Sequence, residues 1–336
     1  MHRRNLKAGS VLVLVLASPS FAQGPPAGAA DVCKSLSFPA QPPAGPPAIK
    51  PANQSVRVLA FGDYGDGGKD QLKAAAAMAT YHQNPKHPFD FGITLGDNFY
   101  PTGLNSATHP RWSTNWETPY GPLGIRLYVS LGNHDYYDSA SPIAEALYSQ
   151  QSTTWCLPAA YYTYTAGPIQ FFALDTDSIM RAAQQGQDRT PIDIQKKWLK
   201  EQLEVSKSPW KVVYGHHPVY STGEHQDNDP MIKEILPILK NRADVYIAGH
   251  DHDMEYLKPE GGVHFFVSGA GGHDKRALGA DPGNRRLWAK EKVLGFSVLE
   301  SDGSSLSVSF FDEADTQLCK VQLVKGKPPV VTCPKA

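Results

Sequence analysis

Five short polar segments of the chain carry side chains that could bind metal ions or move protons. Each begins with glycine, which lets the chain turn tightly, and then presents carboxylate, amide, imidazole or phenol groups. Such oxygen and nitrogen ligands suit Fe, Mn or Zn. Two of these ions held about 3.5 to 4 Å apart by a shared carboxylate would favour in-line displacement at phosphorus. The segments are Gly62-Asp63-Tyr64-Gly65, Gly96-Asp97-Asn98-Phe99-Tyr100, Gly132-Asn133-His134-Asp135, Gly215-His216-His217-Pro218 and Gly249-His250-Asp251-His252.

Each segment taken alone has an ordinary explanation. An aspartate after a strand is often a helix cap, so Asp63 alone favours a structural role. Asn133 alone favours a turn, and His250 and His252 could share one face of a strand by chance. Five such segments are hard to attribute to chance, because crowded polar groups without partners are costly to bury. We therefore interpret the segments together as one metal-binding site.

Predicted strands stand directly before the polar segments, and open α/β sheets bind ligands at the carboxyl ends of their strands. Helices are predicted over Lys69–His82, Ile192–Val205 and Pro230–Asn241, and the last third is predicted to form hairpins, one of them closed by Ser301-Asp302-Gly303-Ser304. This order of elements predicts an α/β fold with mixed sheets. The predicted strands are Val56–Phe61, Phe91–Leu95, Leu127–Leu131, Gln170–Leu174, Lys211–Tyr214, Val245–Ala248 and Val263–Val267.

The N-terminal region is predicted to be an export signal. Basic residues up to Lys7 precede the short apolar run Val11–Ala17, and Ser20-Phe21-Ala22 ends in a small residue suited to cleavage. A buried strand is the alternative, but it leaves the basic residues unexplained, and the run is too short to cross a bilayer. We expect a signal peptide over residues 1–22, a lead-in rich in Pro, Gly and Ala over 23–52, and a single catalytic domain over 53–336. The mature protein would be secreted or periplasmic.

Charge and cysteine content narrow the function classes. The chain has 32 Lys and Arg against 33 Asp and Glu, so it lacks the basic excess that nucleic-acid binding through phosphate contacts needs. Four cysteines in an exported chain favour disulfides. Cys319 and Cys333 flank a predicted hairpin, which makes them the easier pair, and Cys33 with Cys156 would follow. Four cysteines allow three pairings, and the sequence does not choose among them.

Taken in order, the five polar segments resemble the signature of the calcineurin-like metallophosphoesterases, and Tyr100 narrows the resemblance to the purple acid phosphatases. The resemblance covers about residues 55 to 325. It implies a four-layer fold, with two mixed β-sheets packed together and flanked by helices. Further segments resemble the small tartrate-resistant type of mammals: Glu255-Tyr256-Leu257, Ser268-Gly269-Ala270-Gly271 and Ser221-Thr222-Gly223-Glu224-His225.

The activity that the resemblance implies is acid phosphatase activity with a binuclear metal centre. A metal-bound hydroxide would attack phosphomonoesters directly, and the substrates would be small molecules or phosphorylated proteins. A diesterase or nucleotide hydrolase on the same scaffold is one alternative, and a non-catalytic metal-dependent binding protein is another. We expect a monomer that has no membrane span and does not bind nucleic acid.

The resemblance also implies a set of metal ligands. Between adjacent histidines, His216 fits the family's V-x-x-H spacing, and His217 is the alternative. A phenolate of Tyr100 on ferric iron would give a purple colour. The implied ligands are Asp63, Tyr100 and His252 for Fe(III), Asp97 as the bridge, and Asn133, His216 and His250 for a divalent Fe, Zn or Mn ion.

Two further histidines are implied to act on the substrate. His134 and His225 would hold the phosphate and help to protonate the leaving oxygen. The alternatives are an ordinary surface histidine or a side chain that orients a ligand, and Asp135 is expected to have such a supporting role. Aromatic residues near the site could shape substrate choice, although packing is their ordinary role. They are Trp112, Trp116, Tyr136 and Tyr137.

The stretch Thr176–Pro191 departs from the mammalian type. In that type, a disulfide joins this region to a segment near the last histidine motif, whereas no cysteine stands in residues 176–192 or 226–248 here. In the resembling enzymes this polar stretch is an exposed, flexible loop near the active site, and the resemblance implies the same here. Whether it regulates activity is an open question.

Overall fold

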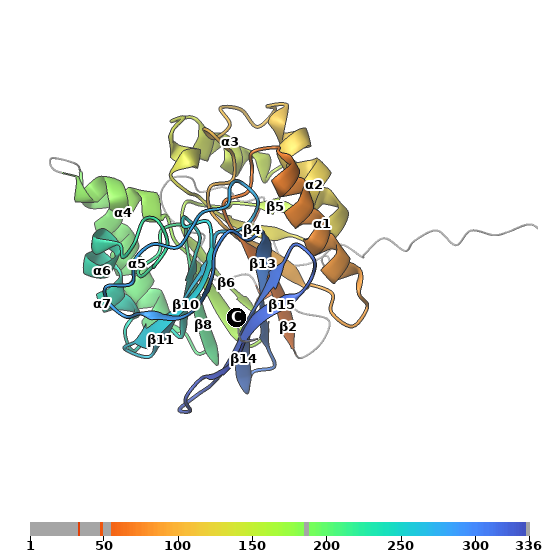
Figure 1. Cartoon of the computed structure of the whole chain (residues 1–336). Helices are drawn as coiled ribbons and strands as arrows, with labels where there is room; N and C mark the ends of the chain where they lie inside the picture. The colour runs from red at the N-terminus through yellow and green to blue at the C-terminus, as the bar shows by residue number, and fades with distance from the viewer. Residues whose placement is uncertain (1–32, 34–47, 50–54, 185–187, 334–336) are drawn as a thin grey trace, which may run out of the picture.

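Two mixed β-sheets form the centre of the protein (Figure 1). The computed structural model describes residues 33, 48–49, 55–184 and 188–333, so the predicted signal peptide lies outside the described residues. One sheet runs in the order β16 (Val330–Thr332), β15 (Gln317–Val324), β14 (Ser305–Asp312), β13 (Gly295–Ser301), β2 (Val56–Phe61), β3 (Phe91–Leu95), β4 (Leu127–Ser130) and β5 (Trp155–Cys156). The other runs in the order β1 (Ala48–Ile49), β6 (Tyr162–Ala166), β7 (Ile169–Ala173), β8 (Trp210–Tyr214), β9 (Val245–Ala248), β11 (Val263–Ser268), β10 (Met254–Glu260) and β12 (Arg286–Lys290).

Helices flank both sheets, which gives the four layers that the family resemblance implies (Figure 1). In Figure 1, α1 and α2 lie on one side of the sheets and α4 to α7 on the other. The α-helices are α1 (Lys69–Gln83), α2 (Thr118–Tyr120), α3 (Ser141–Tyr148), α4 (Thr176–Ala183), α5 (Thr190–Val205), α6 (Asp229–Glu234) and α7 (Leu236–Leu239). Short turns of other types are the π-helix η2 (Ser113–Glu117) and the 3₁₀ helices η3 (Gly121–Leu123) and η4 (His134–Tyr136).

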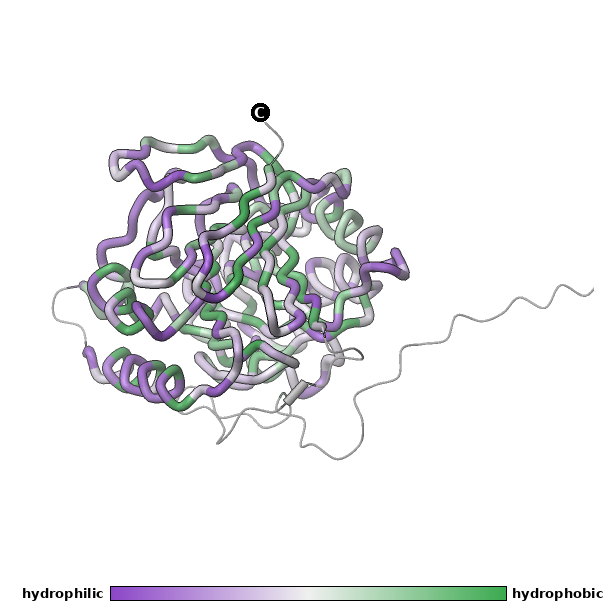
Figure 2. Tube along the Cα trace, turned by 90° about the horizontal axis from the view of Figure 1, so that it is seen from below, coloured by the Kyte–Doolittle hydropathy of each residue, from purple (hydrophilic) through white to green (hydrophobic). Residues whose placement is uncertain are grey.

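Buried strands explain why the layers pack. Successive side chains of a strand point to opposite faces, and in β8 Val212 and Tyr214 join the core between the sheets while Val213 joins the core under α4 to α7. Both faces of this strand are therefore buried at its carboxyl end, which is why Val212–Tyr214 is a continuous apolar run. Figure 2 shows hydrophobic residues gathered in the central strands and hydrophilic residues along the outer loops.

The predicted strands all occur, with ends that agree within one or two residues. The hairpin predicted at Ser301-Asp302-Gly303-Ser304 joins β13 and β14 in antiparallel register. One predicted helix, Pro230–Asn241, is wrong in its continuity, because it is split at Ile235 into α6 and α7. Pro237 lacks the backbone N–H that would continue the α6 hydrogen-bond pattern.

The prediction of a flexible loop over Thr176–Pro191 is wrong for most of its length. Thr176–Ala183 forms α4, capped where the Asp175 side chain accepts a hydrogen bond from the Ser178 N–H. Ile179 and Ala182 bury one face of this helix in the core. The polar composition hid these two apolar positions, which are three residues apart and therefore share a helix face.

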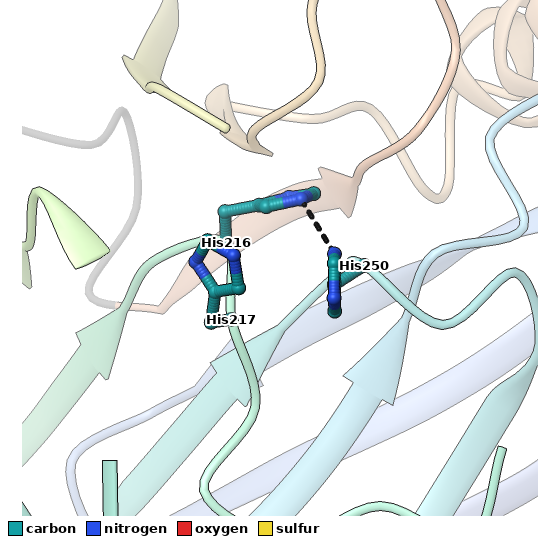
Figure 3. Close-up of side chains that lie close together, drawn as sticks. All are labelled: His216, His217 and His250. Carbon is teal, nitrogen blue, oxygen red and sulfur yellow. Dashed lines mark hydrogen bonds between the residues drawn. The ribbon is translucent and has the colours of Figure 1, made fainter. Parts of the chain in front are cut away.

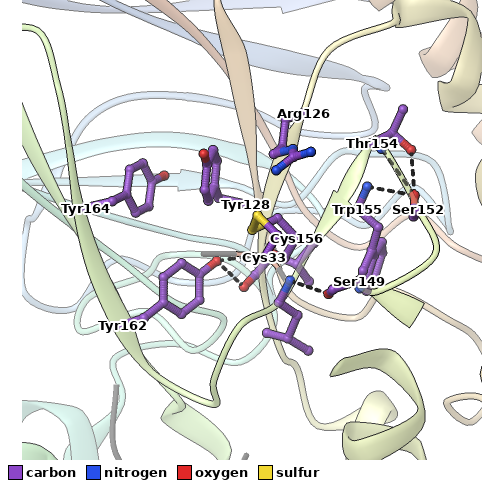
Figure 4. Close-up of a disulfide and its surroundings, with 12 residues drawn as sticks. Cys33, Arg126, Tyr128, Ser149, Ser152, Thr154, Trp155, Cys156, Tyr162 and Tyr164 are labelled. Atoms are coloured by element: carbon purple, nitrogen blue, oxygen red, sulfur yellow. Dashed lines mark hydrogen bonds between the residues drawn. A yellow bond between two sulfur atoms is a disulfide. The ribbon is translucent and has the colours of Figure 1, made fainter. Parts of the chain in front are cut away.

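The structure chooses among the three possible pairings: the disulfides are Cys33–Cys156 and Cys319–Cys333, the pairs suggested in the sequence analysis. The first is buried beside β5, among tyrosine side chains (Figure 4). The Tyr162 hydroxyl donates to the Val129 carbonyl next to it, at 2.7 Å. No helix in the described part of the chain is both long and apolar enough to cross a bilayer.

Candidate metal centre

The proposed ligands meet where strand ends of the two sheets approach each other. Asp63 follows β2, Asp97 and Tyr100 follow β3, and Asn133 follows β4, three neighbouring parallel strands of one sheet. The histidines follow β8 and β9, which are parallel neighbours in the other sheet. The Gly249 N–H donates to the His216 carbonyl at 3.0 Å and joins these last two turns. Each sheet therefore supplies part of the site.

Asp63, Tyr100 and His252 form one half of the site. The Tyr100 hydroxyl lies 3.2 Å from Asp63 Oδ1 and 3.4 Å from His252 Nε2, and Nε2 is also 3.4 Å from Asp63 Oδ1. All three side chains are buried. Burial, together with the neighbouring Asp97 carboxylate, raises the pKa of Asp63. A cation would offset the cost of keeping these acidic groups ionised.

Asp97 lies between the two halves. Its Oδ2 accepts a hydrogen bond from the Tyr100 hydroxyl at 2.9 Å, and its Oδ1 lies 3.4 Å from His216 Nε2. Oδ1 also accepts the backbone N–H of His134 at 2.9 Å. One oxygen of Asp97 thus faces each half, which suits a carboxylate shared by two ions.

Asn133, His216 and His250 form the other half. His216 Nδ1 lies 2.9 Å from the Leu95 carbonyl, which can only accept, so Nδ1 carries the hydrogen and Nε2 of the neutral ring carries a lone pair. That Nε2 lies 3.0 Å from Asn133 Oδ1 and 3.1 Å from His250 Nδ1. Burial lowers the pKa of His216 and of His250, which favours neutral rings.

Acceptor atoms therefore converge on a common space. Asp63, Asp97 and His216 offer ligand atoms that all lie within 4.8 Å of one another. Neither Asp97 Oδ1 nor Asn133 Oδ1 can donate to the lone pair of His216 Nε2. Lone pairs that face one another repel unless a cation lies among them. The residues present thus fit a metal centre.

Three of these residues adopt backbone conformations that are unusual for residues other than glycine. Asp63, Asp97 and His250 have φ of 61°, 52° and 71°. Left-handed backbone of this kind costs free energy and often occurs at functional sites. The turns after β2, β3 and β9 therefore bear strain where they direct proposed ligands.

His217 lies beside the cluster. Its backbone N–H donates to Thr176 Oγ1 at 3.0 Å, and its Nδ1 lies 2.9 Å from the same oxygen. Figure 3 shows its ring next to those of His216 and His250, whose mutual hydrogen bond is drawn. His216, His217 and His250 also form a group that could hold a metal ion. Only His216 of the adjacent pair contacts Asn133 and Asp97.

The two histidines proposed to act on the substrate flank the cluster and are partly exposed. His134 Nδ1 lies 2.7 Å from the Pro101 carbonyl, so its Nε2 faces Asp97 Oδ2, at 3.9 Å. His225 uses both its backbone N–H and Nδ1 to contact Asp251 Oδ1, at 2.9 and 2.8 Å. The His225 ring centroid lies 4.1 Å from that of His250. The structure thus brings both next to the proposed ligands.

Asp135 lies beneath the turn that carries Asp97, in agreement with a supporting role. It is fully buried and accepts hydrogen bonds from the backbone N–H groups of Gly132, Asn98 and Phe99 at 2.8, 2.9 and 3.1 Å. These contacts fix the turns after β3 and β4 against each other.

Sequence reasoning missed several supporting residues. Asp274 contacts Nδ1 of His252, and Asp251 contacts His225. Buried Glu145 on α3 accepts a hydrogen bond from Asn98 Nδ2 at 3.1 Å. Asp251 stands inside a recognised segment and could have been found there. No sequence motif identified Asp274 or Glu145, because each lies outside the polar segment whose residue it contacts.

A separate cavity of about 340 Å³ lies beside α4, and no proposed metal ligand lines it. Its polar groups already have partners. The Tyr136 hydroxyl donates to Asp175 at 2.9 Å, and Arg181 lies over the Tyr136 ring and pairs with Asp177 at 2.8 Å. We assign this cavity no part in the chemistry.

Known proteins match the part of the chain that carries the proposed ligands. The family described as calcineurin-like phosphoesterase matches residues 56–254, more than half of the chain. Tartrate-resistant acid phosphatase type 5 of Sus scrofa is 30% identical over 296 residues, which cover 80% of this chain and 86% of that protein. Purple acid phosphatase 7 of Arabidopsis thaliana is 28% identical over 297 residues, which cover 83% and 89%.

Solved structures agree on the fold. GAP50, the anchor in the inner membrane complex of Plasmodium, has a TM-score of 0.71 at 22% identity, covering 81% of this chain and 90% of that one. Purple acid phosphatase PPD1 from yellow lupin has a TM-score of 0.61 at 16% identity, covering 80% and 54%. At these identities the likeness shows the fold alone. Fold, site and sequence relatives together establish that this chain belongs to the calcineurin-like phosphoesterases, a family of hydrolases, and that its relatives there include tartrate-resistant and purple acid phosphatases.

Proposed function

We propose that this protein is an acid phosphatase that hydrolyses phosphomonoesters at a binuclear metal centre. The observation that carries the proposal is the convergence of possible ligand atoms from both sheets around Asp97. A single shared carboxylate with ligands on either side is what a two-metal phosphoesterase needs. Small phosphomonoesters or phosphorylated proteins would be the substrates.

Seven residues would hold the metals. Fe(III) and a divalent Fe, Zn or Mn ion, when bound, would supply positive charge that activates water and neutralises the phosphoryl oxygens. The ligands would be Asp63, Tyr100 and His252 on one side, Asp97 as the bridge, and Asn133, His216 and His250 on the other. Oxygen and imidazole donors without thiolate agree with these metals.

His134 and His225 would help to protonate the leaving oxygen. The hydrogen of His134 Nδ1 is held by the Pro101 carbonyl, so Nε2, which faces Asp97, is the atom that would accept or give a proton. An imidazole can protonate the leaving oxygen near neutral or mildly acidic pH. Asp251 would fix the ring of His225 in the same way. The chain needs no nucleophile of its own.

We further propose that the protein acts outside the cytosol. The disulfides Cys33–Cys156 and Cys319–Cys333 support an oxidising compartment. The predicted signal over residues 1–22 would take it there.

The test is turnover of an aryl phosphomonoester by the metal-loaded mature protein at mildly acidic pH, with Asp97→Asn beside it. We expect the variant to lose activity by a factor on the order of 10² to 10³, because the amide keeps the shape but removes the bridging charge. Metal analysis should find two ions per wild-type chain and fewer in the variant. Tyr100→Phe should lose the visible absorption of an iron phenolate.

Two results would count against the proposal. Wild-type protein that binds two metals but hydrolyses no monoester would exclude the phosphatase. Faster turnover of a diester than of the matched monoester would assign the site to a phosphodiesterase instead.

A further inference from the structure

We infer that Tyr137 makes this site prefer phosphomonoesters with aromatic leaving groups, by offering its exposed ring as a stacking surface. The inference rests on the proposed function. Four aromatic residues stand near the site in the sequence, and three of them pack inward. Trp112 and Trp116 are buried in the core, and Tyr136 bonds to Asp175. Tyr137 leaves 60% of its surface exposed.

Two contacts hold the Tyr137 ring at the border of the metal centre. Its hydroxyl accepts a hydrogen bond from Asn133 Nδ2 at 2.9 Å, which leaves Asn133 Oδ1 to face His216. Its ring centroid lies 4.6 Å from that of His134. Tyr137 is thus attached to a proposed ligand at one end and packed against the proposed proton donor along its ring.

The three rings form a row that leads out of the site. Tyr100 is buried, the centroid of His134 lies 4.4 Å from it, and Tyr137 follows towards solvent. A leaving group protonated by His134 must lie close to that imidazole, and the next surface outward is the Tyr137 ring. An aromatic group can stack there, whereas a short alkyl group finds little to contact.

Holding the ring in place also makes stacking more favourable. A side chain already fixed by a hydrogen bond and a ring contact loses little conformational freedom when a ligand binds. Aromatic pairs gain about two- to tenfold in affinity from their contact. We expect a preference of that size for an aryl over an alkyl phosphoryl ligand.

Direct binding tests this without turnover. Calorimetry on the metal-loaded protein would compare phenylphosphonate with methylphosphonate, which share the anionic head and differ in the ring. Tyr137→Leu should weaken phenylphosphonate binding by about two- to tenfold and leave methylphosphonate unchanged. Tyr137→Phe, which keeps the ring, should retain most of the preference. Ile143→Ala, an exposed apolar change on α3, is the control and should alter neither.

The outcomes separate the two proposals. Equal weakening of both ligands by Tyr137→Leu, or no weakening of either, overturns the stacking role. If the wild type hydrolyses neither phenyl phosphate nor glycerol phosphate, the proposed phosphatase activity is overturned. If Tyr137→Leu nevertheless weakens phenylphosphonate binding alone, the stacking role stands. Metal content of each variant must match wild type, because Tyr137 also contacts Asn133.

Discussion

Single hydrogen bonds decide which atoms of the site are available for chemistry. The Leu95 carbonyl holds the hydrogen of His216 on Nδ1, and the Pro101 carbonyl does the same for His134. Both rings are left with Nε2 facing Asp97. A backbone carbonyl cannot change its role as acceptor, so these orientations are fixed by the fold.

The proton-transfer role of His134 leads to a prediction at this scale. His134→Ala should lower kcat for an alkyl phosphate by a factor on the order of 10² to 10⁴, because a poor leaving group needs a proton. A 4-nitrophenyl leaving group needs less help, so its kcat should fall much less. Steady-state kinetics on both esters, with the exposed His87→Ala as control, would check this. An equal fall on both would indicate that His134 does not protonate the leaving group.

Turns after strands are the elements on which the site depends. The turn after β4 passes so close to the turn after β3 that a side chain on Gly132 would overlap the backbone nitrogen and Oδ1 of Asp97. Only glycine permits this approach. Turn geometry therefore sets the position of the proposed bridge.

Gly132→Ala should move Asp97 and disable the site. A displacement of about 1 Å can cost on the order of a hundredfold in rate, and we expect at least that loss with reduced metal content. Gly121→Ala is a matched control, because the nearest atom to its added carbon is 3.6 Å away. Activity and metal analysis of both variants would check the prediction, and retention of bound metal in Gly132→Ala would contradict it.

Helix α3, which the sequence analysis did not identify, carries a buried glutamate that should make the free energy of unfolding depend on pH. Burial, and then the Asp135 carboxylate, raises the pKa of Glu145 above its ordinary value of 4.5. A carboxyl whose pKa is higher in the folded state holds its proton there, so its contribution to stability falls as pH rises above about 4.5. Glu145→Gln removes the titrating carboxyl group, and with it this loss of stability at higher pH. The free energy of unfolding of the variant, relative to wild type, should therefore increase between pH 4.5 and 7.5, as measured by urea denaturation. A difference that stays constant with pH would show that Glu145 does not titrate in this way.

The whole molecule is two sheets that must dock for the site to exist. Asp63, Asp97 and Asn133 come from one sheet, and the proposed histidine ligands come from the other. Each sheet alone would carry an incomplete set. Global stability and site integrity are therefore linked.

The disulfide that encloses the longer stretch of chain should contribute more to that stability, because loop-closure entropy grows with the logarithm of loop length. Cys33–Cys156 spans 123 residues and Cys319–Cys333 spans 14, so loop-closure entropy gives about 5 and about 3 kcal/mol respectively. Replacing each pair by serine should lower the free energy of unfolding in that order, as chemical denaturation would measure. A larger loss from the Cys319–Cys333 pair would mean that native-state contacts outweigh chain entropy.

Much of the fold followed from local sequence. β2, β3 and β9 are short, largely apolar segments, and their predicted bounds match the structure. Two helices were harder to recognise. Helix α3 exposes Ile143 and Leu147 while it buries Glu145, and α4 has few apolar positions. The sequence predicts one helix in place of α6 and α7, because the residues on both sides of Ile235 favour a helix.

The sequence by itself determined the five polar turns and their ligand chemistry, because residue type and position after a strand are local properties. Only the tertiary structure decided which atoms meet. The hydrogen bond from His216 to Leu95 joins residues 121 apart, and Asp274 reaches His252 from a loop 22 residues away. The partners of Asn98 on α3 and in the turn after β4 likewise depend on packing. Such contacts form only when segments that are distant in the sequence pack together, within a sheet or between the two sheets, and no local pattern records them.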